Sequence, residues 1–312
     1  MPIPQQFLMQ KPDVFASHLH ADPHASLHRI DGQLVAHDNE IGTLLSIGHF
    51  GHLRASEIAA AVWPDSPEES GQKMARRTLK RLLEAHEILE RPNSLGGMSF
   101  VLTKRGAARL KTYEFEFADG YDIQGVQGPT FWHRTLASAY LISQATNAIV
   151  IGEYAIAKAK HALGKARLQA QYKKLPDGLI LTPGKQQGID ADFVAAWVEV
   201  ESSFKPDVQL EKMLSQAWQL GHYMDAGERV LLDEMVVVYD ARAGHEVRLI
   251  KAAKRMQSRD IRRRQEAGES HVDADEYRPI WGSVLLVSAD ISPPLHVRGW
   301  HHKSLLDCLD GR

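Results

Sequence analysis

The spacing of hydrophobic residues predicts a run of helices followed by a hairpin in the first third of the chain. Apolar residues recur at helical intervals in residues 39–53, 54–63 and 68–90. Residues 88–103 then show two short strand-like runs around a Gly-Gly turn. Thr103 is a suitable N-cap for a last short helix over residues 104–110. The pattern therefore predicts three helices, a β-hairpin and a closing helix.

The third of these helices has an apolar side and a basic side. Its apolar positions include Leu79 and Leu82, and its basic residues are Arg76, Arg77, Lys80 and Arg81. By the order of its elements, the segment 37–112 resembles a winged helix-turn-helix domain. The resemblance implies that the third helix enters the major groove of DNA and that the hairpin contacts the backbone. A solvated basic face, or a protein-binding winged helix, is the alternative interpretation.

Elements of both types alternate after this segment. We expect residues 1–36 to be an N-terminal arm and the glycine-containing residues 113–129 to be a linker. The last part, residues 130–312, alternates strand-like and helix-like runs, which is typical of an α/β domain with a mixed central sheet. Its predicted strands cover residues 177–183, 192–202, 234–240, 282–290 and 295–300, and its longest predicted helices cover residues 207–225 and 246–265.

The predicted strand AAWVEVESS carries two glutamates in an apolar setting. Residues two apart in a strand share a face, so Glu199 and Glu201 project from the same side as Trp197. Carboxylates on a buried face need a neutralising charge. Asp177 stands at the head of the preceding strand and can converge with both glutamates at one end of a hairpin. Three such carboxylates would suit a hard divalent cation, Mg²⁺ or Mn²⁺. An edge strand with Lys205 as a simple ion-pair partner is the alternative.

The motifs PDG at 176–178 and EVE at 199–201 resemble those of the PD-(D/E)XK nuclease superfamily. The resemblance is closer to one subgroup, the replication-relaxation proteins and nuclease-like mobilisation relaxases of plasmids, which join a winged helix to a nuclease-like domain. It implies a restriction-endonuclease-like fold in which Asp177, Glu199 and Glu201 hold the metal. Glu201 stands where the superfamily usually has lysine, and Lys212, on the next predicted helix with Tyr223, is assigned the lysine's role in orienting water or phosphate.

Composition limits the class of protein. The 312 residues are 44% hydrophobic and 24% charged, and the net charge is −2, which fits a globular protein. One cysteine excludes an internal disulfide and favours a reducing, cytoplasmic location. The start of the chain lacks the features of a signal peptide. No apolar run approaches the roughly 20 residues that span a bilayer, so we expect no membrane association.

Two functions that involve DNA therefore stay open, beside a third in which the chain is an adaptor whose two domains bind only proteins. The first is a DNA-binding protein of a mobile element, acting in plasmid mobilisation or replication relaxation, that nicks or cleaves DNA with Mg²⁺ or Mn²⁺. The second is a non-enzymatic winged-helix regulator or replication factor in which the nuclease-like domain is a degenerate scaffold. DNA is the expected partner in both, with a second copy of the chain or other mobile-element proteins as further candidates.

Overall fold

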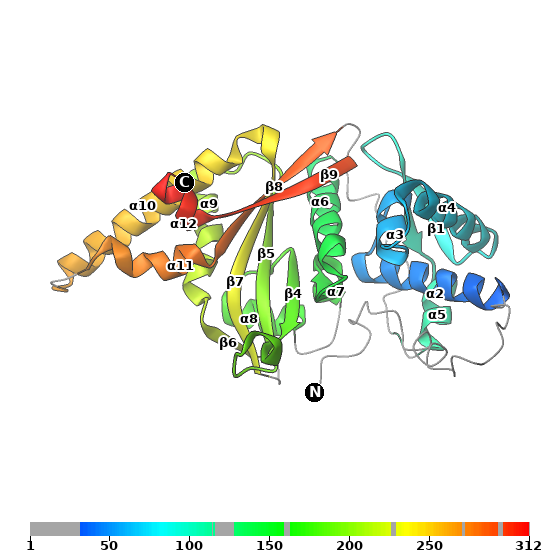
Figure 1. Ribbon diagram of the computed structural model, residues 1–312, viewed down its shortest axis with the longest axis horizontal. Coiled ribbons are helices and arrows are strands. Elements are labelled where there is room, and N and C mark those ends of the chain that lie inside the picture. Colours follow the sequence, from blue (N-terminus) through cyan, green and yellow to red (C-terminus); the bar gives the residue numbers. More distant parts are fainter. Residues whose placement is uncertain are drawn as a thin grey trace, which may run out of the picture. The chain divides into compact units, whose positions relative to one another are not determined.

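A computed structural model describes residues 32–113, 115, 128–158, 163–225, 229–269, 272–292 and 296–311. The chain forms two compact units, the first ending at Arg167 and the second beginning at Leu168. The fold is a mixed α/β arrangement with a mixed multi-stranded sheet (Figure 1). None of the helices in these described ranges is both long and apolar enough to cross a lipid bilayer.

The first unit contains the predicted helices and hairpin. Its elements are α2 (Gly32–Phe50), α3 (Ala55–Val62), α4 (Glu68–Glu84), β1 (Ile88–Pro92), β2 (Met98–Leu102), α5 (Lys104–Lys111), α6 (Pro129–Gln144), β3 (Ile149–Gly152) and α7 (Glu153–Lys158). Helix α8 (Lys165–Tyr172) begins at its end and continues into the second unit. Helix α2 starts at Gly32, so the helix begins earlier than the predicted boundary at residue 37.

The hairpin is held in register by the chain before it and by its own turn. Strands β1 and β2 are antiparallel, with Ile88 opposite Leu102. Leu53, between α2 and α3, forms an additional antiparallel bridge to Phe100 on β2. Gly96 has a φ of 79°, which side chains other than glycine rarely adopt, and the tight turn needs this conformation. The hairpin is therefore fixed to the helices and not a free ribbon.

Helix α4 buries the apolar side that the sequence predicts. Leu79 and Leu82 are buried, together with Ala75 and Thr78 on the same face. Thr103 caps α5 as predicted, because its hydroxyl accepts a hydrogen bond from the Gly106 N–H at 3.1 Å. These contacts leave the opposite face of α4 in water.

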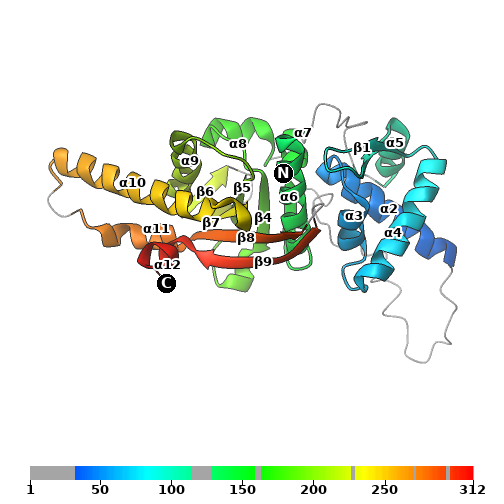
Figure 2. The same ribbon diagram turned by 90° about the horizontal axis from the view of Figure 1, so that it is seen from above.

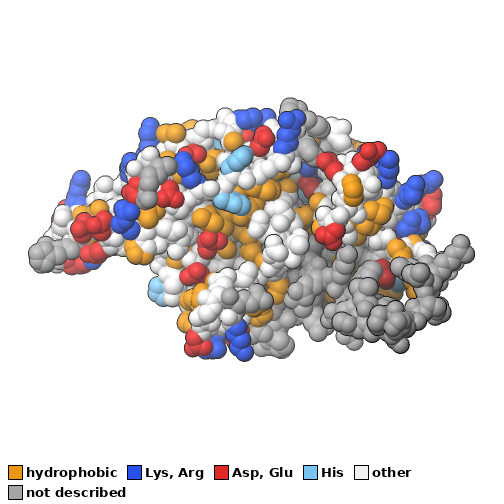
Figure 3. Space-filling model, viewed as in Figure 1, with side chains coloured by type: hydrophobic (Ala, Val, Ile, Leu, Met, Phe, Trp, Pro, Cys, Tyr) orange, Lys and Arg blue, Asp and Glu red, His pale blue; other side chains and the backbone are white. Residues whose placement is uncertain are grey.

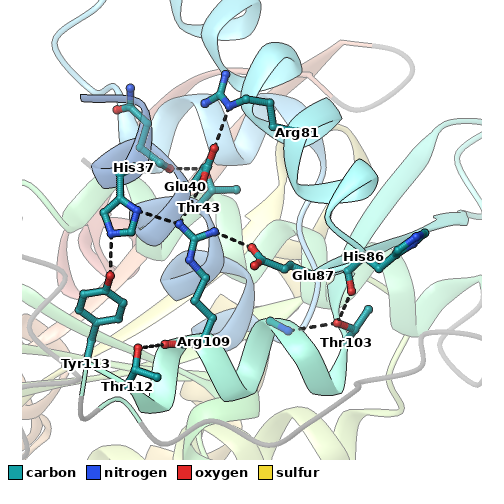
Figure 4. A network of polar contacts seen from close by, with 12 residues as sticks. His37, Glu40, Thr43, Arg81, His86, Glu87, Thr103, Arg109, Thr112 and Tyr113 are labelled. Carbon is teal, nitrogen blue, oxygen red and sulfur yellow. Dashed lines mark hydrogen bonds and ion pairs between the residues drawn. The ribbon is translucent and has the colours of Figure 1, made fainter. Parts of the chain in front are cut away.

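An ionic network joins α2, α4, α5 and the turn before β1 (Figure 4). The Arg109 guanidinium contacts Glu40 at 2.9 Å and Glu87 at 2.6 Å, and Arg81 contacts Glu40 at 2.8 Å. Burial alone would raise the pKa of Glu40, but the hydrogen bonds from Arg81 and Arg109 outweigh it and lower that pKa. Arg109 therefore stabilises two partly buried carboxylates at once.

We expect Arg109→Met to destabilise the first unit by about 3 kcal/mol, because it leaves two carboxylates without their shared cation. Urea unfolding of the full chain would measure the loss. Arg105→Met is the matched control, since Arg105 is exposed on the same helix. Equal unfolding midpoints for the two variants would show that the ion pairs of Arg109 contribute nothing.

A buried histidine makes the first unit sensitive to acid. His52 is 2% exposed, and its ring stacks on Phe131 with ring centroids 5.0 Å apart. Burial, reinforced by the nearby cations Arg134 and Arg54, lowers its pKa from 6.5 to about 3. The folded state therefore keeps this ring neutral, while the unfolded chain binds a proton below pH 6.5.

The stability that His52 contributes is complete above pH 6.5 and is lost as the pH falls towards the folded-state pKa of about 3. We expect a loss of about 1.4 kcal/mol per pH unit within that window. Unfolding free energies of the wild type and of His52→Leu, compared from pH 7 down to about pH 5 where carboxylates begin to protonate, isolate this effect. Identical pH slopes would contradict it.

The second unit is built on a sheet of mixed strand direction. Its strands are β4 (Gly178–Pro183), β5 (Phe193–Glu201), β6 (His222–Asp225), β7 (Arg229–Asp240), β8 (Val284–Ser292) and β9 (His296–Ser304). The order is β4-β5-β7-β8-β9, with β6 pairing β7. Strands β5, β7 and β8 are mutually parallel, whereas β4 and β9 run antiparallel to their neighbours. The buried β5 and β7 form its centre.

Helices and short helical turns of the second unit lie between these strands, and one helix follows the last strand. They are η3 (Gly184–Gln187), α9 (Asp207–Leu214), η4 (Ser215–Gln219), η5 (Ala241–Ala243), α10 (His245–Glu266), η6 (Ala274–Tyr277), α11 (Arg278–Gly282) and α12 (Leu305–Asp310). Helices α9 and α10 pack against each other, and the C-terminal part of α10 extends past the strands (Figure 2).

The division of the chain differs from the expected linker at 113–129. Helix α6 begins at Pro129 and packs against α3, so α6 belongs to the first compact unit. The boundary between the compact units along the sequence consequently follows Arg167 and does not lie near residue 130. Most of the expected linker, residues 114 and 116–127, and the arm before Gly32 lie outside the described residues.

Candidate functional site

The structure places Asp177 beside Glu199. Strand β4 starts directly after Asp177 and pairs with β5, with Gly178 opposite Val198. The Asp177 N–H donates to the Val198 carbonyl at 2.9 Å, and the Asp177 carboxylate accepts from the Val200 N–H at 2.7 Å. Of the three carboxylates that the sequence predicts to converge, Asp177 and Glu199 therefore lie close together at one end of the hairpin.

Glu199 is buried and already neutralised by a lysine. Its side chain accepts a hydrogen bond from the Trp197 indole N–H at 2.6 Å and forms an ion pair with Lys174. Burial raises the pKa of Glu199, Lys174 lowers it, and the charge of Asp177 raises it further. The net shift is upward, so this carboxylate holds its proton more tightly than an exposed glutamate does.

Glu201 is the most deeply buried of the three carboxylates. Its side chain is 0% exposed and forms an ion pair with the Lys205 ammonium at 3.1 Å. This ion pair is not a hydrogen bond, and neither Glu201 oxygen has a hydrogen-bond partner in the described part of the chain. The Lys205 ammonium instead donates a hydrogen bond to the Val200 carbonyl at 3.3 Å. His245, at the start of α10, is also buried, and burial lowers the pKa of its imidazole. The nearby charge of Glu201 raises the pKa of His245 and so partly opposes this effect.

Lys212 lies elsewhere, which corrects the sequence-based assignment. Helix α9 buries Leu210, Met213 and Leu214, so position 212 falls on its outer, exposed face. There Lys212 lines a groove between α9 and α10 together with Met256 and Arg259. Among the described residues, the lysines that form ion pairs with the two glutamates are Lys174 and Lys205.

Tyr223 is also not on a helix. It lies on strand β6, is half exposed, and donates its hydroxyl hydrogen to the Asp190 carbonyl at 2.8 Å. The predicted helix over 207–225 ends after η4, at Gln219, and the chain then turns into the sheet at Gly221, whose φ is 82°. The sequence gives a hint of this turn, because glycine precedes the strand.

Each of the three acidic residues has a hydrogen-bond or ion-pair partner within the protein. Within the described ranges, no group of three or more Asp, Glu, His or Cys side chains is placed to hold a metal ion. Mg²⁺ requires several oxygen ligands at short distance. Here the Asp177 carboxylate accepts a backbone N–H and each glutamate has a lysine, so the geometry fits neutralisation by lysine better than by a cation.

The basic face of α4 is exposed, with one exception. Arg76, Arg77 and Lys80 are exposed, and Figure 3 shows Lys and Arg side chains together with acidic ones over the region of α4. Lys80 has only a long contact of 3.9 Å to Glu84. Arg81, which the sequence groups with them, is instead partly buried and bonded to Glu40, because its position faces α2. Three of the four predicted DNA-contacting cations therefore project into water.

Lys174 is the site residue that sequence reasoning missed. It lies in the turn between α8 and β4, three residues before Asp177, and reaches across to Glu199 on the neighbouring strand. A lysine just before the Asp at the head of a predicted strand was the available signal.

Comparison of the chain with protein-family models, with curated proteins and with solved structures finds no match.

Proposed function

We propose that this chain is a sequence-specific DNA-binding protein whose first unit acts as a winged helix-turn-helix domain. The observation that carries the proposal is the exposed trio Arg76, Arg77 and Lys80 on α4, opposite that helix's buried face. Helix α4 follows two shorter packed helices and precedes a hairpin, which is the position of a recognition helix. The Leu53–Phe100 bridge supports the same reading, because it ties the hairpin to the chain between α2 and α3.

In this proposal each part of the first unit has a role on DNA. Helix α4 lies in the major groove, where arginine can read guanine and contact phosphate. The β1–β2 hairpin lies against the backbone. The Glu40–Arg81–Arg109 network holds α4 against α2 and α5, so that α4 is presented as a rigid element.

We further propose that the second unit is a nuclease-like scaffold that does not cut DNA. The antiparallel β4–β5 pair, followed through α9 by the parallel strand β7, supports a restriction-endonuclease-like arrangement. The ion pairs of Glu199 and Glu201 with lysines favour a structural role for these carboxylates. The protein would then be a regulator or replication factor of the mobile-element class.

Selection from a random duplex DNA library tests the proposed binding. We expect the full chain to enrich a defined sequence, because base contacts in the major groove discriminate between base pairs. Arg76→Ala/Arg77→Ala should not enrich that sequence. A wild-type protein that retains all duplexes equally would contradict sequence-specific recognition.

Metal-dependent nicking of DNA is the second candidate function, and the closeness of Asp177 to Glu199 favours it. Lys174 would have to leave Glu199 before a cation bound there. Incubation of supercoiled DNA with the protein and Mg²⁺ or Mn²⁺, against EDTA, is the test. Nicking that Glu199→Gln abolishes would establish the enzyme, whereas intact plasmid supports the scaffold.

A further inference from the structure

The second unit exposes apolar side chains at the carboxyl ends of its parallel strands. Phe204, in the loop after β5, is 80% exposed, and Val208, in the first turn of α9, is 76% exposed. They are the two most exposed large hydrophobic side chains in the described ranges. Val247, in the first turn of α10, is 56% exposed. Exposed apolar groups that lie together mark a binding surface more often than isolated ones do.

One face of the Phe204 ring is covered by a cation. The central guanidinium carbon of Arg248 lies 4.0 Å from the ring centroid, and the same guanidinium donates a hydrogen bond to the Lys205 carbonyl. This pair of contacts fixes Arg248 and orients the ring. Since the side chain is still 80% exposed, the other ring face is open to a planar ligand.

A line of basic residues continues from this ring along α10. Residues four apart share a helix face, and these positions hold Lys251, Arg255, Arg259 and Arg263. From Arg248 to Arg263 the helix rises about 22 Å, which is the length of several nucleotides. Figure 3 shows basic side chains together with acidic ones over this region.

The acidic side chains on this face are already used by the arginines. Arg255 contacts Asp207 at 3.1 Å, Arg259 contacts Glu211, and Arg263 contacts Asp260 at 2.5 Å. The groove between α9 and α10, with a volume of about 310 Å³, adds exposed Lys212 beside the apolar side chains of Trp218 and Met256. The face therefore keeps a positive excess next to an aromatic platform.

We propose that this face, defined by Phe204, Arg248, Lys251 and Lys212, binds single-stranded DNA. An unpaired base stacks on the open face of Phe204, and the phosphates follow the cations of α10. A duplex cannot offer a base face to the ring, so the aromatic platform selects unpaired strands. Lysine is depleted in the centre of protein–protein interfaces, which makes a protein partner the less suitable occupant. The proposal uses no residue of α4.

Fluorescence anisotropy of the full chain with a labelled oligothymidine of about 20 nucleotides tests this site. We expect Phe204→Ala to weaken binding about tenfold or more, because one stacked base is lost. Phe204→Tyr keeps the stacking surface and should bind as the wild type does. Lys251→Ala should flatten the salt dependence of binding. Binding to the selected duplex should be unchanged in the Phe204 variants, which separates this proposal from recognition by α4.

Two results would overturn the proposal. One is equal affinity of the wild type and Phe204→Ala for the oligonucleotide. The other is a lower molecular mass of Phe204→Ala than of the wild type in sedimentation, with no change in oligonucleotide affinity. That result would assign the patch to contact between two copies of the chain.

Discussion

Replacing Lys205 with Met should destabilise the second unit by about 3–5 kcal/mol, because it leaves a buried carboxylate without its cation. Glu201 is 0% exposed and has no hydrogen-bond partner among the described residues, so Lys205 is its principal compensation. The nearby imidazole of His245 cannot replace the lysine, since burial lowers the pKa of His245 and favours its neutral form.

The double variant Lys205→Met/Glu201→Gln should recover much of this loss, because the remaining amide is uncharged. Hydrogen exchange of the β5 amides measures the effect locally and does not require the two units to unfold together. Lys212→Met is the matched control, since that lysine is exposed and should change stability by less than about 0.5 kcal/mol. A Lys205→Met protein with wild-type exchange rates would show that Glu201 is stabilised in another way.

The sequence was sufficient to place the acidic residues but not their partners. The strands predicted over residues 177–183 and 192–202 follow from local patterns, and the structure has strands there, at Gly178–Pro183 and Phe193–Glu201. The partner of Glu199 is Lys174, which reaches it only because β4 lies beside β5. Such contacts depend on the path of a turn and on a side-chain rotamer, and neither is encoded in hydrophobic spacing.

Helix phase explains the wrong assignment of Lys212. A helix was predicted over residues 207–225, of which α9 forms the first part, but the side that faces the sheet depends on which residues meet the strands. Leu210, Met213 and Leu214 take that side, and this leaves Lys212 outside. These three apolar residues already mark the buried side of the helix in the sequence, and position 212 does not belong to it. Arg81 shows the same limit on α4, because its contact with Glu40 depends on the packing of α2.

The domain boundary could not be predicted from composition. Glycine and polar residues at 113–129 indicate a break in regular structure, but they do not reveal which unit the following helix joins. Helix α6 packs on α3, and this contact between residues far apart in sequence moves the boundary to Arg167.

Removing Arg76 and Arg77 should weaken duplex binding about 30-fold or more, because two base or phosphate contacts are lost, each contributing at least about 1 kcal/mol. Both side chains are exposed on α4, and no ion pair within the described residues competes for them. The change should leave stability nearly unaltered, since neither side chain is buried. Arg105→Ala/Lys111→Ala removes two exposed cations of α5 and controls for the loss of charge.

A salt titration of duplex binding tests the central claim most directly. Each phosphate contact releases counterions and contributes about 0.9 to the slope of log affinity against log salt concentration. If both arginines contact phosphate, Arg76→Ala/Arg77→Ala should lower the magnitude of that slope by about 1.8, while the α5 control keeps the wild-type slope. Equal slopes and affinities for the α4 variant and the wild type would contradict the assignment of α4 as the DNA-contacting helix.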